Sequence, residues 1–194
     1  MNTFFTADTH FSHSGIIHYC NRPFSSFEEM NETIIQNWNN KVQPKDTVYH
    51  LGDFAFGQRA EILSLTKRLN GHIILIEGNH DNIGQPKNYG FSEKYPIREI
   101  KLEGHHITLN HYAMRVWNKS HYDSWHLYGH SHSTLEPIGK SWDIGVDNNK
   151  FFPLSFDEIK KIMDNQPHNF NWVSRLPGYT VEAFEQARII EEMK

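Results

Sequence analysis

An α/β fold is the class that this sequence predicts, and two observations carry the prediction. Short apolar runs typical of strands alternate with longer segments of helical periodicity, as in layered α/β domains. Several apolar runs, at residues 3–7, 47–51, 73–76 and 126–128, lead directly into clusters of aspartate, asparagine and histidine. Ligands bind at the carboxyl ends of strands in open α/β sheets, so the sequence predicts a polar site at that edge.

The composition fits one domain of ordinary size. Of the 194 residues, 38% are hydrophobic and 22% are charged, which is typical of a globular protein with a full core. No apolar run approaches the roughly 20 residues needed to cross a bilayer, and no secretory signal is visible, so we expect no membrane association. Cys20 is the single cysteine. No intrachain disulfide can form, and we expect a reducing, cytoplasmic setting.

The first expected elements are a strand and a capped helix. The apolar run at residues 3–7 predicts a strand that ends in Asp8-Thr9-His10. Ser26 followed by Glu29 forms a capping-box pattern, after which apolar residues recur at helical spacing. We expect this helix to end near Val42, shortly before a proline.

The middle of the chain predicts two further strands around a second helix. A strand at residues 47–51 ends in Gly52-Asp53, and a strand at residues 73–76 ends in the segment Glu77-Gly78-Asn79-His80-Asp81. Between them residues 60–69 have helical periodicity, and the helix is closed by Asn70-Gly71.

The remaining elements complete the α/β pattern. Residues 98–102 and 107–110 predict a hairpin around the turn at 103–106. A strand at residues 126–128 ends in Gly129-His130-Ser131-His132, and residues 140–146 are a further strand candidate. Ser155 is expected to cap a helix that runs through Met163. Residues 180–193 predict a final helix, packed on the same domain or, alternatively, on a partner chain.

The polar residues at the strand ends have the chemistry of metal ligands. Asp53 offers two oxygens that can bridge two cations, and Asn79 offers a neutral carbonyl oxygen. Mixed carboxylate and imidazole ligation suits Zn, Fe or Mn, whereas Ca prefers all-oxygen sites. One ion cannot use this many ligands, so the sequence predicts a pair of divalent ions. The candidate ligands lie in five segments of the chain: Asp8, His10, Asp53, Asn79, His111, His130 and His132.

The ordered set of motifs resembles that of the calcineurin-like metallophosphoesterase family, and in particular its compact bacterial and phage members. The motifs are Asp8-x-His10, Gly52-Asp53, Gly78-Asn79-His80-Asp81, His111 and Gly129-His130-Ser131-His132. The resemblance implies a four-layer α/β/β/α sandwich with two mixed β-sheets flanked by helices. It implies a family domain over residues 1–165, followed by a C-terminal helical extension, 166–194, to which no family role is carried over.

The resemblance also implies a role for each site residue. His80 would protonate the leaving group, and Asp81 would orient the His80 ring. A hydroxide that bridges two metal ions would attack the phosphorus of a phosphodiester or phosphomonoester. Mn is the ion expected in vitro, and Fe, Zn and Ni fit the same ligands. One ion would be held by Asp8, His10, Asp53 and His132, and the other by Asp53, Asn79, His111 and His130.

The substrate is less clearly marked. Arg22, His13 and Arg115 lie close in sequence to ligands and are candidate phosphate or substrate contacts, with solvated loop residues as the alternative reading. Several aromatic residues near the ligands could stack a base or serve the core: Tyr19, Phe54, Phe56, Tyr112 and Trp117. We expect a small phosphoester, with nucleotides among the candidates.

Two rival functions use the same residues differently. A nuclease would need an extended cationic surface, and the formal net charge of −4 without a lysine and arginine cluster argues against long nucleic acid as a partner. A non-catalytic scaffold of the same fold would be expected to lack ligands or the acid, and all of them are present here. The oligomeric state and the physiological substrate stay open.

Overall fold

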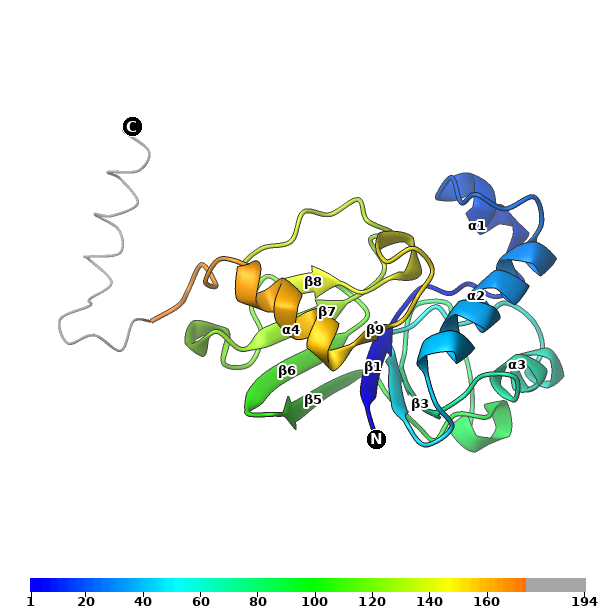
Figure 1. Ribbon diagram of the computed structural model, residues 1–194, viewed down its shortest axis with the longest axis horizontal. Helices are drawn as coiled ribbons and strands as arrows, with labels where there is room; N and C mark the ends of the chain where they lie inside the picture. Colours follow the sequence, from blue (N-terminus) through cyan, green and yellow to red (C-terminus); the bar gives the residue numbers. More distant parts are fainter. Residues whose placement is uncertain (174–194) are drawn as a thin grey trace.

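Two mixed β-sheets form the centre of this computed structural model, which describes residues 1–173 (Figure 1). The first sheet has the strand order β4-β3-β2-β1-β9, in which β9 alone runs antiparallel to its neighbour. The second has the order β5-β6-β7-β8, an antiparallel hairpin followed by two parallel pairings. The strands of the first sheet are β1 (Thr3–Thr6), β2 (Thr47–His50), β3 (His72–Ile76), β4 (Glu93–Tyr95) and β9 (Leu154–Ser155). Those of the second are β5 (Ile97–Leu102), β6 (His105–Asn110), β7 (Trp125–Tyr128) and β8 (Ser141–Asp143).

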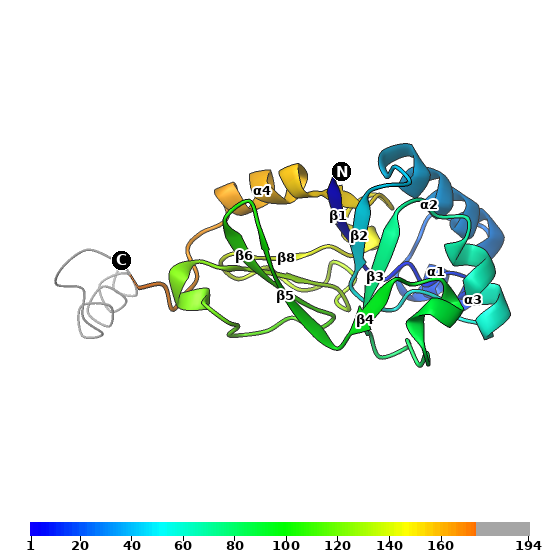
Figure 2. The same cartoon turned by 90° about the horizontal axis from the view of Figure 1, so that it is seen from below.

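Helices flank the sheets and close two cores. The helices α1 (Ser14–Tyr19), α2 (Phe27–Lys41) and α3 (Arg59–Thr66) bury their apolar faces against the first sheet. The helix α4 (Phe156–Asn165) packs on the second core, which lies between the two sheets (Figure 2). The predicted α/β class, with two mixed sheets and flanking helices, is confirmed. Within residues 1–173, no helix is long and apolar enough to cross a membrane.

Local sequence signals account for the long helices. Ser26 accepts a hydrogen bond from the backbone N–H of Glu29 at the start of α2, which ends at Lys41 as predicted. Ser155 and Glu158 form a complete capping box at the start of α4. The second predicted helix is shorter than expected, since α3 ends at Thr66. The helix predicted at residues 180–193 lies outside the described residues.

The shortest elements were not predicted from the sequence. The helix α1 has six residues and β9 has two, which is too few to produce a periodic pattern. In the described part of the chain, three 3₁₀ turns also lie in connections: η1 (Pro86–Tyr89), η2 (Ser120–Tyr122) and η3 (Val146–Asn148). After α4, Asn169 bonds to the backbone of Ser120, Ser124 and Lys140 and so ties the chain to the connections that precede β7 and β8. The domain boundary predicted at residue 165 stays a prediction.

The strand pairing brings the polar segments to one place. The strands β1, β2 and β3 are parallel neighbours in register, with Thr6 opposite His50 and His50 opposite Leu75. Their carboxyl ends therefore form one edge. In the second sheet β6 and β7 are also parallel. A backbone bridge between Ala7 and Gly145 joins the ends of the two sheets, so the site lies where two sheet edges meet.

Candidate metal centre

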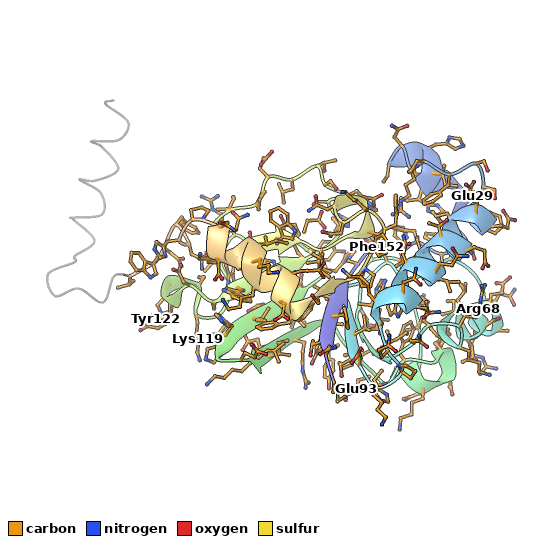
Figure 3. All side chains as sticks on the ribbon, viewed as in Figure 1. Glu29, Arg68, Glu93, Lys119, Tyr122 and Phe152 are labelled. Atoms are coloured by element: carbon orange, nitrogen blue, oxygen red, sulfur yellow. The ribbon has the colours of Figure 1, made fainter. Side chains whose placement is uncertain are left out.

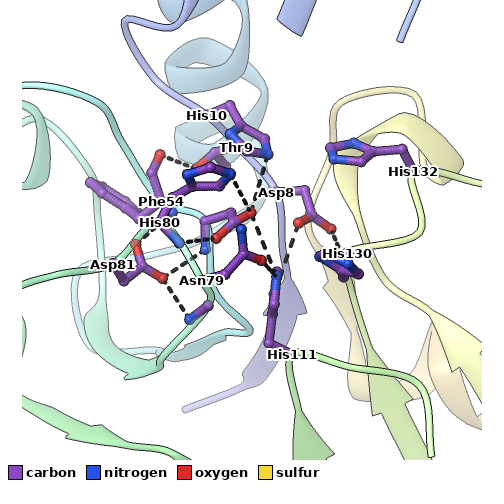
Figure 4. A network of polar contacts seen from close by, with 12 residues as sticks. Asp8, Thr9, His10, Phe54, Asn79, His80, Asp81, His111, His130 and His132 are labelled. Atoms are coloured by element: carbon purple, nitrogen blue, oxygen red, sulfur yellow. Dashed lines mark hydrogen bonds and ion pairs between the residues drawn. The ribbon is translucent and has the colours of Figure 1, made fainter. Parts of the chain in front are cut away.

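Loops from both sheets converge on one cluster of carboxylates and imidazoles (Figure 4). The cluster contains two groups whose ligand atoms lie within 4.8 Å of one another. The first group is Asp8, His10 and His132, and the second is Asp53, His111 and His130. These six residues come from four segments of the chain, which the sequence predicts to lie together.

Asp53, a member of the second group, also faces the first. Its Oδ2 lies 3.6 Å from Nε2 of His10 in the first group and 3.5 Å from Nε2 of His111 in the second. Asn79 is beside the second group, with its Oδ1 3.1 Å from Nε2 of His111. One carboxylate facing both groups is the arrangement that two adjacent cations require of a shared ligand.

The donor atoms fit bound cations. Oδ1 of Asp8 and both ring nitrogens of His10 are buried without a hydrogen-bond partner among the described residues. Buried polar atoms are normally paired, and each unpaired one in a native structure calls for an explanation. A divalent ion ligated by a carboxylate oxygen and an imidazole nitrogen would satisfy Oδ1 of Asp8 and one of the two ring nitrogens of His10.

The electrostatics of the cluster also favours bound cations. Burial raises the pKa of Asp8 to about 7, although the imidazoles of His132 and His111 oppose the rise. Burial alone would lower the pKa of His111, but contact with Asp53 and the charge of Asp8 raise it above its ordinary value. Burial also acts to raise the pKa of Asp53, yet contact with His111 and a bond from the His80 backbone hold that pKa low. A cation would displace protons here.

His80 lies at the open side of the cluster. Its side chain is 45% exposed, and its Nε2 is 3.9 Å from Oδ2 of Asp53. Its ring is flanked by Phe56 at 5.0 Å and by His10 at 5.7 Å between ring centroids. It therefore stands beside the ligands while remaining accessible to a substrate.

Asp81 does not orient the His80 ring, and that prediction is wrong. Its two carboxylate oxygens accept hydrogen bonds from the backbone N–H groups of Asp53 at 2.7 Å, Gly78 at 2.9 Å and Phe54 at 2.9 Å. The carboxylate instead joins the loop after β2 to the loop after β3. It holds the backbone that carries Asp53 in place.

Arg22 is not a substrate contact, which corrects a second prediction. The residue is only 4% exposed. Its guanidinium donates to both carboxylate oxygens of Asp147 at 2.8 Å and to the carbonyl oxygens of Asp8 at 2.7 Å and Thr9 at 3.1 Å. An exposed loop and a buried one look alike in sequence, so the orientation of this arginine could not be predicted.

The other predicted substrate contacts have different surroundings. The half-buried ring of His13 stacks on Phe56 with a centroid distance of 4.1 Å and lies 5.6 Å from His10, close to the cluster. The guanidinium of Arg115 lies over the ring of Phe170 at 4.8 Å. Both roles stay predictions. Among the aromatic candidates Phe54 and Trp117 belong to the core.

Asp147 is a site residue that sequence reasoning missed. Its Oδ2 accepts a hydrogen bond from Nδ1 of His132 at 2.7 Å. It follows a predicted strand at residues 140–146, so the strand-end pattern that found the other ligands could have found it. Cys20 lies near the same pair. Burial raises the pKa of the Cys20 thiol to about 11, which disfavours the thiolate that binds metals.

Buried polar contacts also fix the loops beneath the ligands. The Oγ1 of Thr9 donates to the carbonyl of Phe54 at 2.7 Å, and Nε2 of His50 lies 2.9 Å from the same hydroxyl. Burial lowers the pKa of His50 to about 3. Its ring is therefore neutral near pH 7 and donates one hydrogen bond, which links the loops that carry His10 and Asp53.

Comparison with known proteins identifies a family and several proteins that this chain resembles. The calcineurin-like phosphoesterase superfamily domain matches residues 1–142. The uncharacterized protein MJ1445 of Methanocaldococcus jannaschii is 38% identical over 167 residues, covering 81% of this chain and 89% of that protein. A crystal structure of the protein of unknown function AQ665 from Aquifex aeolicus matches with a TM-score of 0.68 and 29% identity, over 83% of this chain and 98% of that one. The phosphoesterase YfcE of E. coli matches at a TM-score of 0.42 and 21% identity, over 75% of this chain and 78% of that one.

Proposed function

This chain belongs to the calcineurin-like phosphoesterase superfamily, and from that premise we propose that it hydrolyses a phosphodiester or phosphomonoester with the help of two divalent metal ions. The observation that carries the proposal is the position of Asp53 between two groups of ligands. The unpaired buried atoms of Asp8 and His10 support it. Mn is the ion proposed for work in vitro, and Fe, Zn and Ni fit the same donors.

Each group has the side chains to hold one ion. In this proposal Asp8, His10 and His132 serve the first ion, Asn79, His111 and His130 serve the second, and Asp53 serves both. Ions held there would supply Lewis acidity that activates water near neutral pH and neutralises charge on the phosphoryl oxygens. The buried surroundings of Asp8 and His111 exclude bulk water, which strengthens electrostatic interactions at the phosphoryl group.

His80 acts as the proton donor to the leaving group in this proposal. Its exposed ring lies next to Asp53 and is not needed to complete either group of ligands. A general acid must reach the departing oxygen, and a ring at the open side of the site meets that requirement. The neighbouring ring of Phe56 restricts the positions of the imidazole.

A small, nucleotide-like substrate is the proposed class. Tyr19 is 80% exposed and Tyr112 is 47% exposed, and the ring of Tyr112 lies 4.8 Å from that of His130. Burial and the neighbouring His80 lower the pKa of His13, which favours a neutral ring stacked on Phe56. Aromatic faces at the rim suit stacking with a planar base. The net charge of −4 argues against a long nucleic acid.

A substrate panel tests this function. The full chain would be assayed with a monoester, a linear diester, a cyclic nucleotide and single-stranded DNA, with Mn and with a chelator control. We expect turnover of a small ester that chelation abolishes and added Mn restores. Turnover of DNA alone, with a steep salt dependence, would favour the nuclease instead. No turnover of any ester by the metal-loaded chain would contradict the proposal.

A further inference from the structure

We propose that Arg22 is a positioning residue for one metal ion of the pair, the ion assigned to Asp8, His10 and His132. Through Asp147 it fixes the ring of His132, and through two backbone carbonyls it fixes the loop that carries Asp8 and His10. The inference rests on the proposed function, because it presupposes that this group holds an ion. It adds a role for two residues that lie outside the ligand groups.

The path from Arg22 to His132 consists of short, buried contacts. The Nε and Nη2 atoms of Arg22 each donate to a different oxygen of Asp147, both at 2.8 Å. Oδ2 of Asp147 also accepts from Nδ1 of His132 at 2.7 Å. With Nδ1 engaged in this way, Nε2 is the ring nitrogen left for an ion. A carboxylate that orders a ligand histidine is a common outer-shell device, and here an arginine orders the carboxylate.

A second set of contacts joins Arg22 to the loop after β1. Its Nη2 donates to the carbonyl oxygen of Asp8 at 2.7 Å, and its Nη1 donates to that of Thr9 at 3.1 Å. Asp8 and His10 have φ angles of 57° and 48°, a region that costs energy for residues other than glycine. Bonds to the carbonyls of this loop therefore help to hold a strained conformation.

These contacts all serve one ligand group. The guanidinium of Arg22 bonds to Asp8, Thr9, Asp147 and the sulfur of Met30, and none of these is a member of the group of Asp53, His111 and His130. The backbone of Asp53, the ligand shared by both groups, is held separately by Asp81, whose carboxylate accepts from the N–H groups of Asp53 and Phe54. Loss of Arg22 should therefore weaken the first ion and spare the second.

Arginine is the residue that this geometry requires. Its planar guanidinium presents donors in several fixed directions, so one side chain can bind a carboxylate with two bonds and still reach two carbonyls. A lysine at this position keeps the charge but offers a single nitrogen. The substitution Arg22→Lys thus removes the geometry while retaining the charge.

The first experiment counts bound Mn and measures the affinity for each ion in Arg22→Lys. We expect two ions in the wild-type chain and a 10- to 100-fold weaker affinity for one of them in the variant, the range found for outer-shell partners. Arg68→Lys is the matched control, because the exposed side chain of Arg68 (labelled in Figure 3) makes a similar two-bond contact with Glu32, away from the ligands. An equal loss of both ions, or no difference from the control, would overturn the inference.

Two variants that each weaken one ion, used as starting points, identify which ion Arg22→Lys affects. His10→Ala should weaken the first ion and His130→Ala the second. Added to His130→Ala, the Arg22→Lys change should leave no tightly bound ion. Added to His10→Ala, it should leave the remaining ion in place, because both changes act on the same group. Loss of the remaining ion in the His10→Ala background would overturn the inference.

A measurement on the metal-free wild-type chain tests the inference even if the variants do not fold. Nitrogen NMR of the His132 ring, at a pH where the ring is neutral, should show the proton on Nδ1, and Asp147→Asn should give a mixture of tautomers or a changed Nδ1 shift. A proton on Nε2 in the wild-type chain would contradict the positioning role. A wild-type chain that binds fewer than two ions while showing the Nδ1 proton would count against the proposed function alone.

Discussion

The ligands of the candidate centre are conformationally unusual residues. Five of them have positive φ angles: Asp8, His10, Asp53, His130 and His132. Aspartate and histidine tolerate this region better than most residues, but few non-glycine residues adopt it. Such conformations persist only where the surrounding contacts enforce them, and they gather at functional sites. At these strand ends the backbone therefore adopts locally unfavourable conformations that direct the ligand side chains toward one point.

Asp53 is the residue on which both ligand groups depend. The change Asp53→Asn removes the charge that faces His10 and His111 at 3.6 and 3.5 Å. We expect the variant to lose both ions and to lose turnover by more than about 100-fold, beyond the effect of outer-shell changes. Metal analysis beside an activity assay checks this. A variant that keeps two ions would show that Asp53 is not shared.

His80 is expected to affect chemistry without affecting metal binding. For His80→Ala we predict two bound ions and a loss in kcat of roughly 10²- to 10⁴-fold with an alkyl leaving group. The loss should be much smaller with an aryl leaving group of low pKa, which departs without a proton. A series of leaving groups measures this dependence. If His80→Ala releases an ion, the assigned role is incorrect.

Residue identity was more predictable than residue surroundings. The seven candidate ligands follow from motifs at strand ends, and the structure brings them together. The partners of Arg22 and Asp81 could not be predicted, because either side chain can turn toward solvent, substrate or backbone. Nothing in the local sequence specifies which direction the fold imposes.

At the scale of elements, glycines allow the strand ends to meet. Gly52 has φ +88°, and a Cβ there would lie 2.6 Å from Cα of Gly78 and from Nδ1 of His111. A Cβ on Gly129 would lie 2.6 Å from Oδ2 of Asp8. Any side chain at these positions would push ligand-bearing loops apart. The glycines next to Asp53 and His130 are thus part of the packing of the centre.

Asp81 supports the connection between two strand ends, and its replacement should reduce stability. In Asp81→Asn the amide places N–H donors where backbone N–H groups of Asp53, Phe54 and Gly78 now donate. An unsatisfied buried donor costs about 1–3 kcal/mol, so we expect a lower free energy of unfolding by that amount. Denaturant unfolding of the metal-free protein measures it.

The same variant separates two roles for this carboxylate. If Asp81 ordered the His80 ring, Asp81→Asn would alter the His80 tautomer while leaving stability unchanged. The structure predicts the opposite, because backbone N–H groups occupy the carboxylate oxygens.

Long elements were predictable and short ones were not. The capped helices α2 and α4 and the hairpin of β5 and β6 follow from periodicity and capping residues. The strands β4 and β9 depend on pairing with neighbours that are distant in sequence. Tertiary contacts decide such elements, and local patterns contain little of that information.

The stability of the whole molecule depends on whether protons or metal ions are bound to the candidate ligands. Asp8 has a pKa of about 7 in the fold against 3.8 as the ordinary value, and the pKa values of His111 and His132 are also raised. A raised pKa means that the folded chain binds protons that the unfolded chain has released, so stability falls as pH rises through the folded pKa. Ionised Asp8 without a cation destabilises the fold by about 4 kcal/mol relative to its protonated form.

We therefore predict opposite pH responses with and without metal. Buried histidines such as His50 and His126 have pKa values below the ordinary 6.5. Below pH 6.5 the unfolded chain therefore binds more protons at these rings than the folded chain does, and stability rises with pH. Above pH 6.5 the pH dependence of stability comes mainly from Asp8, His111 and His132, whose pKa values are raised. The melting temperature of the metal-free protein should therefore fall between pH 6.5 and 8. Metal affinity should rise over the same interval, because binding releases protons. Thermal scans with Mn and with a chelator check both trends.

The shared role of Asp53 is tested most directly by the number of divalent ions that the wild-type chain binds, measured by elemental analysis together with turnover of a small phosphoester. Two ions per chain are expected, with chelation removing the ions and the activity together and added Mn restoring both. A chain that takes up only one ion, or that hydrolyses the ester equally well after complete chelation, would contradict that role.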